Sequence, residues 1–195
     1  LSETSPGVTV SPAYTEKFSG TVGLPIPNTE ISIRDDDGNE VERGQPGEIC
    51  IKGPQVMQGY WRNEEATAEA IGEDGFFKTG DIGTMDDEGF LSITDRKKDM
   101  IIVSGFNVYP NEIEDVVCMH PNIVEAASIG VPDEKTGEAV KLFVVLGGEQ
   151  KLAKEEIIEY CRQNLAAYKV PKQIEFMNEL PKTTVGKILR RELRE

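Results

Sequence analysis

The segment from Asp95 to Glu114 constrains the fold of this chain more than any other stretch. It begins with five charged residues in a row, Asp95-Arg-Lys-Lys-Asp99, and continues with a short apolar run, Met100–Val103. The apolar run ends at Ser104-Gly105, a pattern that predicts a brief buried strand. Pro110 then predicts the first turn of a helix, because the missing N–H of proline costs nothing there.

The charge run from Asp95 to Asp99 does not suit a buried core, so we expect it to be exposed or to line an interface. A solvated linker is the simplest interpretation, because charge runs are usually hydrated. The charge balance changes at the same place: residues 1–95 contain 6 basic and 19 acidic side chains, whereas residues 96–195 contain 15 and 16. This step predicts two domains, 1–95 and 96–195.

Composition argues against several classes of protein. The net charge of -14 lies mostly in the first half and argues against duplex nucleic acid as a partner, since such a binder needs a basic face. No apolar run approaches the length of a membrane span, and no signal peptide opens the chain. The first residue is Leu1 and not Met, which leads us to expect a fragment of a longer protein.

The three cysteines, Cys50, Cys118 and Cys161, are widely spaced and form no Cys-x-x-Cys pair. Together with a single histidine, His120, they predict a reducing cytoplasm and exclude a zinc site of the usual ligand count. A lone histidine also makes a Ser-His-Asp hydrolase a weak interpretation.

Residue patterns predict an α+β protein in two parts. The first half favours short strands at 29–34, 47–52 and 90–94 and a short helix capped by Asn63, as in a piece of a barrel or sandwich. The second half favours a compact α+β domain. Its expected elements are strands at 100–103, 124–130, 139–146 and 173–177, helices at 110–119, 154–165 and 188–195, and exposed loops at 132–137 and 181–187.

Two short motifs could bind a nucleotide. In Thr79-Gly80-Asp81, a carboxylate follows a glycine at a turn that backbone can approach closely, which suits a grip on two sugar hydroxyls. The alternative is an aspartate that only satisfies a turn. Arg96 could hold a ribose or phosphate with its fork of donors, or it could form an interdomain ion pair.

Two further motifs lie in the second half. Gly105, in Ser104-Gly105-Phe106, carries no side chain, so a slender ligand arm could pass there, although a strand-ending turn is the alternative. The loop at 181–187 lacks the glycine spacing of a Walker loop. Its Lys187 could still deliver a cation to developing phosphoryl charge, or belong to a basic tail.

In this order the motifs resemble those of the acyl-activating, adenylate-forming enzyme superfamily, and the likeness runs through nearly the whole chain. The sequences of these motifs are most similar to those of bacterial long-chain fatty-acid–CoA ligases. The matching segments are GEICIKGPQVMQGYW at 47–61, TGD at 79–81, DRKKDM at 95–100, VSGFNVYPNEIE at 103–114 and LPKTTVGKILRR at 180–191.

The resemblance implies an enzyme that makes acyl-CoA in two half-reactions. ATP and a fatty acid give acyl-AMP and pyrophosphate, with Mg²⁺ on the phosphates, and the thiol of CoA then displaces AMP. Residues 1–95 would be the end of a large adenylating domain whose phosphate loop and acyl tunnel lie upstream, so the fragment alone should be inactive. Alternatives are another adenylate-forming enzyme, such as a carrier-protein-loading domain or an acyl-AMP ligase, and a non-catalytic binding module.

The resemblance also implies a cytoplasmic enzyme. It leaves three properties open: peripheral association of the parent with the inner face of the membrane, the preferred acyl chain length and the oligomeric state. Asp81 would hold the ribose hydroxyls, and Arg96 would add a nucleotide contact. Ser2 would add another, in the place of the family's usual threonine. Glu3 matches the acid that supports Mg²⁺.

The remaining implied roles belong to the second half. Lys187 matches the catalytic lysine that stabilises charge during adenylation. Lys98 falls at the hinge about which the small domain is thought to rotate. That rotation would withdraw Lys187 and present Gly105 and Phe106 to the pantetheine arm of CoA.

Overall fold

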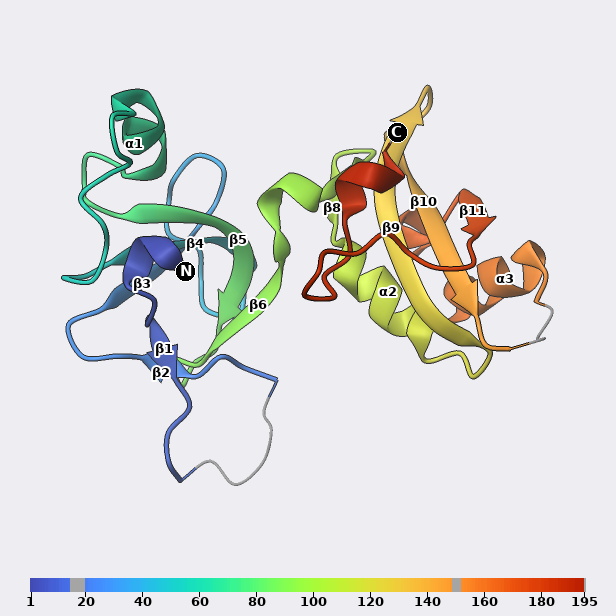
Figure 1. Ribbon diagram of the computed structural model, residues 1–195, viewed down its shortest axis with the longest axis horizontal. Helices are drawn as coiled ribbons and strands as arrows, with labels where there is room; N and C mark the ends of the chain where they lie inside the picture. Colours follow the sequence, from blue (N-terminus) through green and yellow to red (C-terminus); the bar gives the residue numbers. More distant parts are fainter. Residues whose placement is uncertain (15–19, 149–151, 195) are drawn as a thin grey trace. The chain divides into compact units, whose positions relative to one another are not determined.

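The computed structural model describes residues 1–14, 20–148 and 152–194. The chain forms two compact units, Leu1–Lys98 and Asp99–Glu195. The division falls inside the charge run, slightly after the boundary at residue 95 that the sequence predicts. Each unit has its own sheet and its own apolar core (Figure 1).

The N-terminal unit is built on an antiparallel sheet in the order β3-β4-β5-β6. Its strands are β3 (Glu30–Arg34), β4 (Gly47–Lys52), β5 (Phe77–Met85) and β6 (Leu91–Arg96). The unit also contains the 3-10 turn η1 (Ser2–Thr4), the paired strands β1 (Thr9–Val10) and β2 (Leu24–Pro25), and helix α1 (Glu64–Ala70). Alternate strand residues face one side and form a core of Ile33, Ile49, Ile51, Met85 and Leu91.

Asn63 caps α1, as the sequence predicts. Its Oδ1 accepts a hydrogen bond from the N–H of Ala66 at 3.1 Å, which satisfies a donor that has no partner inside the first turn. Glu64 and Glu65 add negative charge at the positive end of the helix.

The C-terminal unit is an α+β fold, which confirms the predicted fold class. Its sheet runs β11-β10-β7-β8, and β9 pairs with β10 outside that path. The β10–β11 pair is parallel, whereas β9–β10, β7–β10 and β7–β8 are antiparallel. The elements are β7 (Ile101–Val103), β8 (Phe106–Val108), α2 (Pro110–Cys118), β9 (Ile123–Asp133), β10 (Gly137–Leu146), α3 (Lys154–Asn164), η3 (Ala167–Lys169), β11 (Gln173–Phe176) and η4 (Arg190–Leu193), and η2 (Lys97–Asp99) spans the division between the units.

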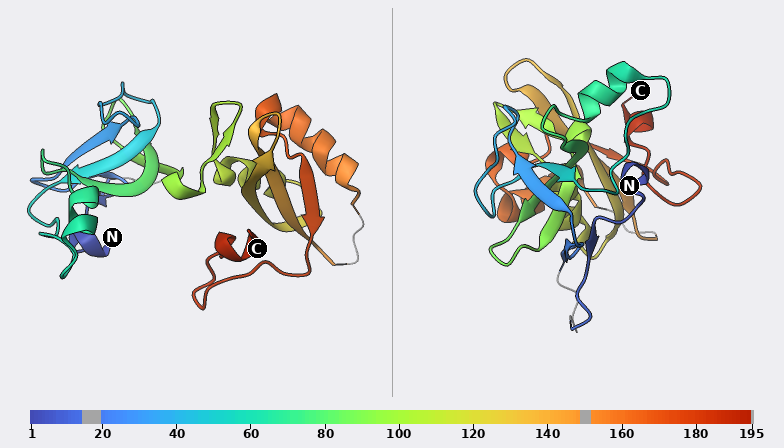
Figure 2. Two further views of the ribbon diagram at one scale, coloured as in Figure 1. Left: turned by 90° about the horizontal axis from the view of Figure 1, so that it is seen from above. Right: turned by 90° about the vertical axis from the view of Figure 1, so that its left-hand side faces the viewer.

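Alternate residues of β10 belong to two different cores. Leu142 and Val144 pack with the apolar sides of α2 and α3. Phe143 faces the other way, where Leu180 and Leu193 pack against it. The segment after β11 therefore covers the face of the sheet opposite to the helices, as the left view of Figure 2 shows for the red C-terminal segment and the orange α3.

The charge run, which we expected to be exposed or to line an interface, is exposed only in part. Asp95 and Asp99 are buried, with 3% and 7% of their surface exposed, whereas Arg96 and Lys98 are exposed. The two acids are buried because each accepts a hydrogen bond. Asp95 Oδ1 accepts the N–H of Arg96 at 2.7 Å, and Asp99 Oδ1 accepts from Arg194 Nη2 at 2.9 Å.

The expected terminal helix at 188–195 is also wrong, because only a 3-10 turn forms at Arg190–Leu193. So short a segment cannot meet the cost of helix nucleation by itself. Its tertiary contacts set its backbone instead: Leu193 is buried in the second core, and Arg190 and Arg194 bond to acids elsewhere in the unit.

Two strands were not predicted from the sequence. The segment after Gly105 forms strand β8, because a two-residue turn returns the chain onto β7. The segment around Gly80 belongs to β5, although Gly and Asp are poor strand formers. The expected loop at 132–137 is mostly hairpin, since β9 extends to Asp133 and β10 begins at Gly137.

Candidate functional site

The turn at Thr79-Gly80-Asp81 interrupts the pairing of β4 with β5. Glu48 pairs with Ile82, and the register then shifts before Cys50 pairs with Lys78. Gly80 has φ 70°, a left-handed conformation that favours glycine, while a Cβ there would meet nothing within 4 Å. Gly80 is therefore required by the backbone conformation and not by lack of space.

Side chains replace the missing ladder bonds of this turn. The Thr79 hydroxyl donates to the carbonyl of Ile49 at 2.8 Å and accepts the N–H of Asp81 at 3.1 Å. The N–H of Gly80 donates to Glu48 Oε1 at 3.1 Å. Two hydrogen bonds consequently fix the turn to β4, and a third within the turn holds Asp81 in one position.

Asp81 and Arg96 lie opposite each other on β5 and β6. Arg96 Nε is 3.8 Å from Asp81 Oδ1, and the side chains are 59% and 21% exposed. Burial raises the pKa of the Asp81 carboxyl above its ordinary value, and the positive charge of Arg96 opposes that shift. The carboxylate is thus partly desolvated and lies beside a cation that remains accessible.

The N-terminal turn η1 places Glu3 beside Tyr60. The Tyr60 hydroxyl donates to Glu3 Oε1 at 3.2 Å, and the pKa of Tyr60 is raised, first by burial and then by the charge of Glu3. The turn is fixed by buried Thr4, whose hydroxyl donates to the carbonyls of Leu1 and Pro6 at 3.2 Å each. Ser2 lies in the same turn and is exposed.

A surface cavity of about 240 Å³ brings the N-terminal turn and the Asp81 turn together. Leu1 and Thr79 both line it, with apolar side chains of β4 and β6. The sequence-predicted residues Ser2, Glu3, Asp81 and Arg96 do not line this cavity themselves, although other residues of η1, β5 and β6 or of the segments next to them do. No group of three His, Cys, Asp or Glu side chains in the described part of the chain is arranged to hold a metal ion.

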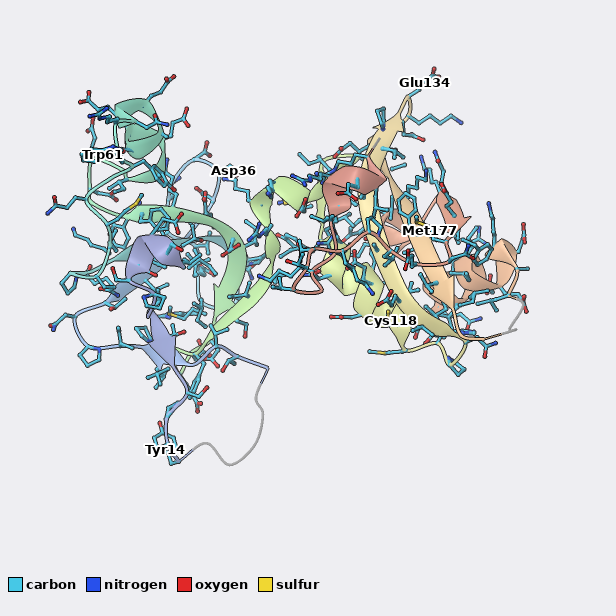
Figure 3. The ribbon with its side chains drawn as sticks, viewed as in Figure 1. Tyr14, Asp36, Trp61, Cys118, Glu134 and Met177 are labelled. Atoms are coloured by element: carbon cyan, nitrogen blue, oxygen red, sulfur yellow. The ribbon has the colours of Figure 1, made fainter. Side chains whose placement is uncertain are left out.

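The residues on either side of Lys98 are anchored, each within its own unit. Lys97 Nζ lies 2.9 Å from Asp36 Oδ1 (Asp36 is labelled in Figure 3) and 3.0 Å from Glu48 Oε2. The hydrogen bond to Asp36 is the main cause of a raised pKa at Lys97. Asp99 accepts from Arg194 at 2.9 Å.

Lys98 itself is exposed, and within residues 1–14, 20–148 and 152–194 it makes no hydrogen bond or ion pair. It is also the residue at which the two compact units divide. A backbone rotation at this position would break no side-chain bond of Lys98, which suits a hinge.

Gly105 lies at the tip of a tight hairpin between β7 and β8. Ser104 has φ 52° and Gly105 has φ 84°, the two left-handed residues of a type I′ turn. The N–H of Ser104 donates to the carbonyl of Thr136 at 2.8 Å, and a Cβ on Gly105 would meet nothing within 4 Å. Phe106 is 55% exposed and stacks on Tyr168, with ring centroids 4.7 Å apart.

Lys187 lies at the end of another tight turn. The N–H of Thr183 donates to the carbonyl of Lys187 at 2.8 Å, and the N–H of Lys187 donates to the Thr183 hydroxyl at 3.1 Å. Gly186 has φ 81°. The Lys187 ammonium is exposed and, in the described part of the chain, has no hydrogen bond or ion pair. It is a cation available to a ligand.

The Lys187 turn is anchored to α2 by a buried ion pair. Arg190 Nη2 lies 2.7 Å from Glu114 Oε2 and 3.0 Å from Asn111 Oδ1. Glu114 Oε1 accepts the N–H of Ser128 on β9 at 2.7 Å. The pair therefore joins the C-terminal segment, α2 and the sheet.

Gly105 and Lys187 are not brought together. The left view of Figure 2 shows the light-green β7–β8 hairpin and the red segment after β11 extending from opposite sides of the C-terminal unit. Sequence reasoning missed Glu48, Tyr168 and Glu114, whose partners lie far away in the chain. Of these three, only Glu114 could have been suspected from the sequence, because it is an acidic residue next to the apolar stripe of a predicted helix.

Among the described residues, the longest and most apolar helices still fall short of what a bilayer crossing requires.

Family comparisons agree with the motifs. Residues 1–61 match the model of the AMP-binding enzymes, and residues 112–187 match the model of the AMP-binding enzyme C-terminal domain. The two models together span most of the chain, which belongs to the AMP-binding enzyme family. It is 58% identical over 195 residues to a long-chain-fatty-acid–CoA ligase of Yersinia pestis, covering 100% of the chain and 34% of that ligase. The chain therefore spans about a third of the length of that relative.

Solved structures of the family share the fold. MatB from Rhodopseudomonas palustris with ATP bound has a TM-score of 0.93 and 38% identity, covering 100% of this chain and 39% of that one. The o-succinylbenzoate CoA synthetase of Bacillus subtilis, in complex with its acyl-adenylate intermediate, has a TM-score of 0.88 and 36% identity, covering 100% of this chain and 40% of that one.

Proposed function

We propose that this chain is the C-terminal part of an ATP-dependent long-chain fatty-acid–CoA ligase. One observation carries the proposal beyond sequence likeness. Lys187, a cation without a bond among the described residues, belongs to the segment after β11, and Gly105 belongs to the uncrowded β7–β8 hairpin; these two segments extend from opposite sides of the C-terminal unit (Figure 2). Two chemically different surfaces suit an enzyme that uses one nucleotide site for two successive reactions.

The first reaction is adenylation. A carboxylate oxygen of the fatty acid attacks the α-phosphorus of ATP, the bond to the β-phosphate breaks, and pyrophosphate leaves. Asp81 accepts hydrogen bonds from the ribose hydroxyls, and Arg96 and Ser2 add contacts to the nucleotide. Lys187 stabilises the negative charge that develops between the carboxylate and the α-phosphate.

Mg²⁺ is the metal that this chemistry implies, and Glu3 fits it. Its Oε1 is occupied by Tyr60, which leaves the second oxygen for a ligand. A single carboxylate suits Mg²⁺, because this ion usually binds through one or two carboxylates together with substrate phosphates. When bound, the ion would neutralise phosphate charge.

The second reaction is thioester formation. The sulfur of CoA attacks the acyl carbon, the bond to the phosphate oxygen breaks, AMP leaves, and the thiol proton passes to solvent. Gly105 leaves room for the pantetheine arm, and the Phe106 ring supplies an apolar wall beside it. Rotation at Lys98 exchanges the Lys187 side of the unit for the Gly105 side.

A cytoplasmic location accords with the cysteines. Cys50, Cys118 and Cys161 are free thiols, as expected in a reducing compartment. Burial raises the pKa of Cys50 and of Cys161 to about 11, so these two thiols stay protonated and unreactive near neutral pH.

The test is an assay of the full-length protein with ATP, oleate and CoA. We expect oleoyl-CoA, AMP and pyrophosphate, and no pyrophosphate from the 195-residue chain alone. A series of acids from two to eighteen carbons would give the chain-length preference. Full-length protein that forms oleoyl-AMP but passes it only to a carrier protein would overturn the assignment to the CoA ligases.

A further inference from the structure

Glu48 lies on β4 and uses its two carboxylate oxygens for two different partners. Oε1 accepts the N–H of Gly80 at 3.1 Å, and Oε2 lies 3.0 Å from Lys97 Nζ. The Glu48 side chain is only 12% exposed, so both bonds are shielded from water. A single carboxylate thereby joins the turn that carries Asp81 to the first residue of η2.

The Gly80 end of this link replaces a ladder bond. The register shift between Glu48 and Cys50 leaves the Gly80 turn outside the regular pairing of β4 with β5. An unpaired N–H in a partly buried place is costly, and the carboxylate removes that cost. Loss of Glu48 should therefore loosen the turn at its glycine, next to Asp81.

The Lys97 end of the link lies beside the hinge. Lys97 follows Arg96, the cross-strand partner of Asp81, and precedes Lys98. Asp36 is a second anchor for the same ammonium, at 2.9 Å. Within the charge run, Lys97 is thus held to the N-terminal unit, whereas the side chain of Lys98, the next residue, makes no hydrogen bond or ion pair among the described residues.

We propose that Glu48 is a positioning residue that holds the Asp81 turn and the entrance to the hinge as one rigid body. Rotation is then confined to Lys98, and the carboxylate that holds the ribose keeps its place while the C-terminal unit changes sides. This inference rests on the proposed function for its catalytic meaning, whereas the physical link can be tested without it.

Hydrogen–deuterium exchange of the 195-residue chain tests the link. Lys97→Met keeps the aliphatic stem and removes the charge that binds Asp36 and Glu48, so it can act on Gly80 through Glu48. We expect amide exchange at Thr79–Asp81 to become about threefold faster in this variant and about fivefold faster in Glu48→Ala. Lys97→Arg should restore the original rate.

Lys52→Met is the matched control. It removes a cation from β4, the strand that carries Glu48. Lys52 Nζ has a hydrogen bond of its own, 2.8 Å to the carbonyl of Asp74. Its exchange at Thr79–Asp81 should equal that of the parent sequence. Unchanged exchange at Thr79–Asp81 in Lys97→Met would overturn the proposal, even if Glu48→Ala fails to fold.

Kinetics of the full-length protein test the catalytic meaning. Lys97→Met should raise the KM for ATP in adenylation about threefold and leave the KM for CoA unchanged, with Lys52→Met again equal to the parent. Faster exchange together with an unchanged KM for ATP would overturn the positioning role. If the unsubstituted full-length protein makes no acyl-AMP, the proposed function fails, while the exchange experiment still decides the link.

Discussion

The turns that carry Asp81 and Lys187 share a local design and differ in their surroundings. Each has a glycine in the left-handed region, with φ 70° at Gly80 and 81° at Gly186. In each, a threonine hydroxyl accepts at 3.1 Å the N–H of the residue to which we assign a role, Asp81 or Lys187. A similar combination of glycine and threonine therefore presents two different side chains.

The difference lies in what holds each turn. The Asp81 turn is bonded to the neighbouring strand β4, and the Asp81 side chain is only 21% exposed. The Lys187 turn is bonded to itself and is exposed, and ion pairs on either side of it, from Lys182 to Glu125 on β9 and from Arg190 to Glu114 on α2, anchor the segment. Under the proposed function, a group needed in both half-reactions should be fixed, whereas a group needed in one must be able to leave. The predictions below test this contrast.

The largest expected effect follows Asp81→Ala in the full-length protein. Two hydrogen bonds to a charged group are lost, so we expect a loss of about a thousandfold in kcat/KM in each half-reaction. Pyrophosphate release and thioester formation from supplied acyl-AMP are measured separately. Damage to only one half-reaction would contradict a fixed, shared role for this carboxylate.

The distant anchor of the Lys187 turn is expected to dominate stability. Glu114→Gln leaves Arg190 buried without its counter-ion, and we expect a loss of about 3 kcal/mol in the free energy of unfolding. Urea denaturation of the whole chain measures it. Combining Glu114→Gln with Arg190→Met should cost less than the sum of the single changes, and strict additivity would mean that the pair is not coupled.

A matched pair of glycine substitutions sharpens the comparison. Gly80→Ala and Gly186→Ala each place a Cβ in open space at positive φ, so each should cost about 1 kcal/mol of stability. Their catalytic effects should differ, with Gly80→Ala slowing both half-reactions and Gly186→Ala slowing adenylation alone. The same rate assays on both variants decide, and indistinguishable rate patterns would remove the contrast.

The smallest effect concerns pH. Because the pKa of Asp81 is raised, the carboxyl takes up its proton above the ordinary aspartate pKa of about 3.9, and we expect AMP affinity to fall several-fold as pH drops through that window. Asp81→Asn should give a flat profile in the same calorimetric titration. The effect on stability has the opposite sign: the folded form binds this proton more tightly than the unfolded form, so protonation of Asp81 in this window raises the free energy of unfolding.

Much of the fold could be predicted, because it depends on local signals. The Asn63 cap, the β4 strand and the helix that begins at Pro110 all follow from residues adjacent in sequence. The terminal segment could not be predicted, since distant acids set its backbone. In the same way, the motif at Thr79–Asp81 could be recognised in the sequence. Its dependence on Glu48 could not be predicted, because the hydrogen bond forms only when β4 lies beside β5.

The central claim is that Lys187 serves adenylation alone, from a side of the C-terminal unit that thioester formation does not use. The most direct measurement is single-turnover kinetics of full-length Lys187→Ala, with oleate and ATP in one experiment and with synthetic oleoyl-AMP and CoA in the other. We predict that acyl-AMP formation falls about a hundredfold or more while thioester formation stays within about threefold of the parent. Equal losses in the two experiments would contradict the account.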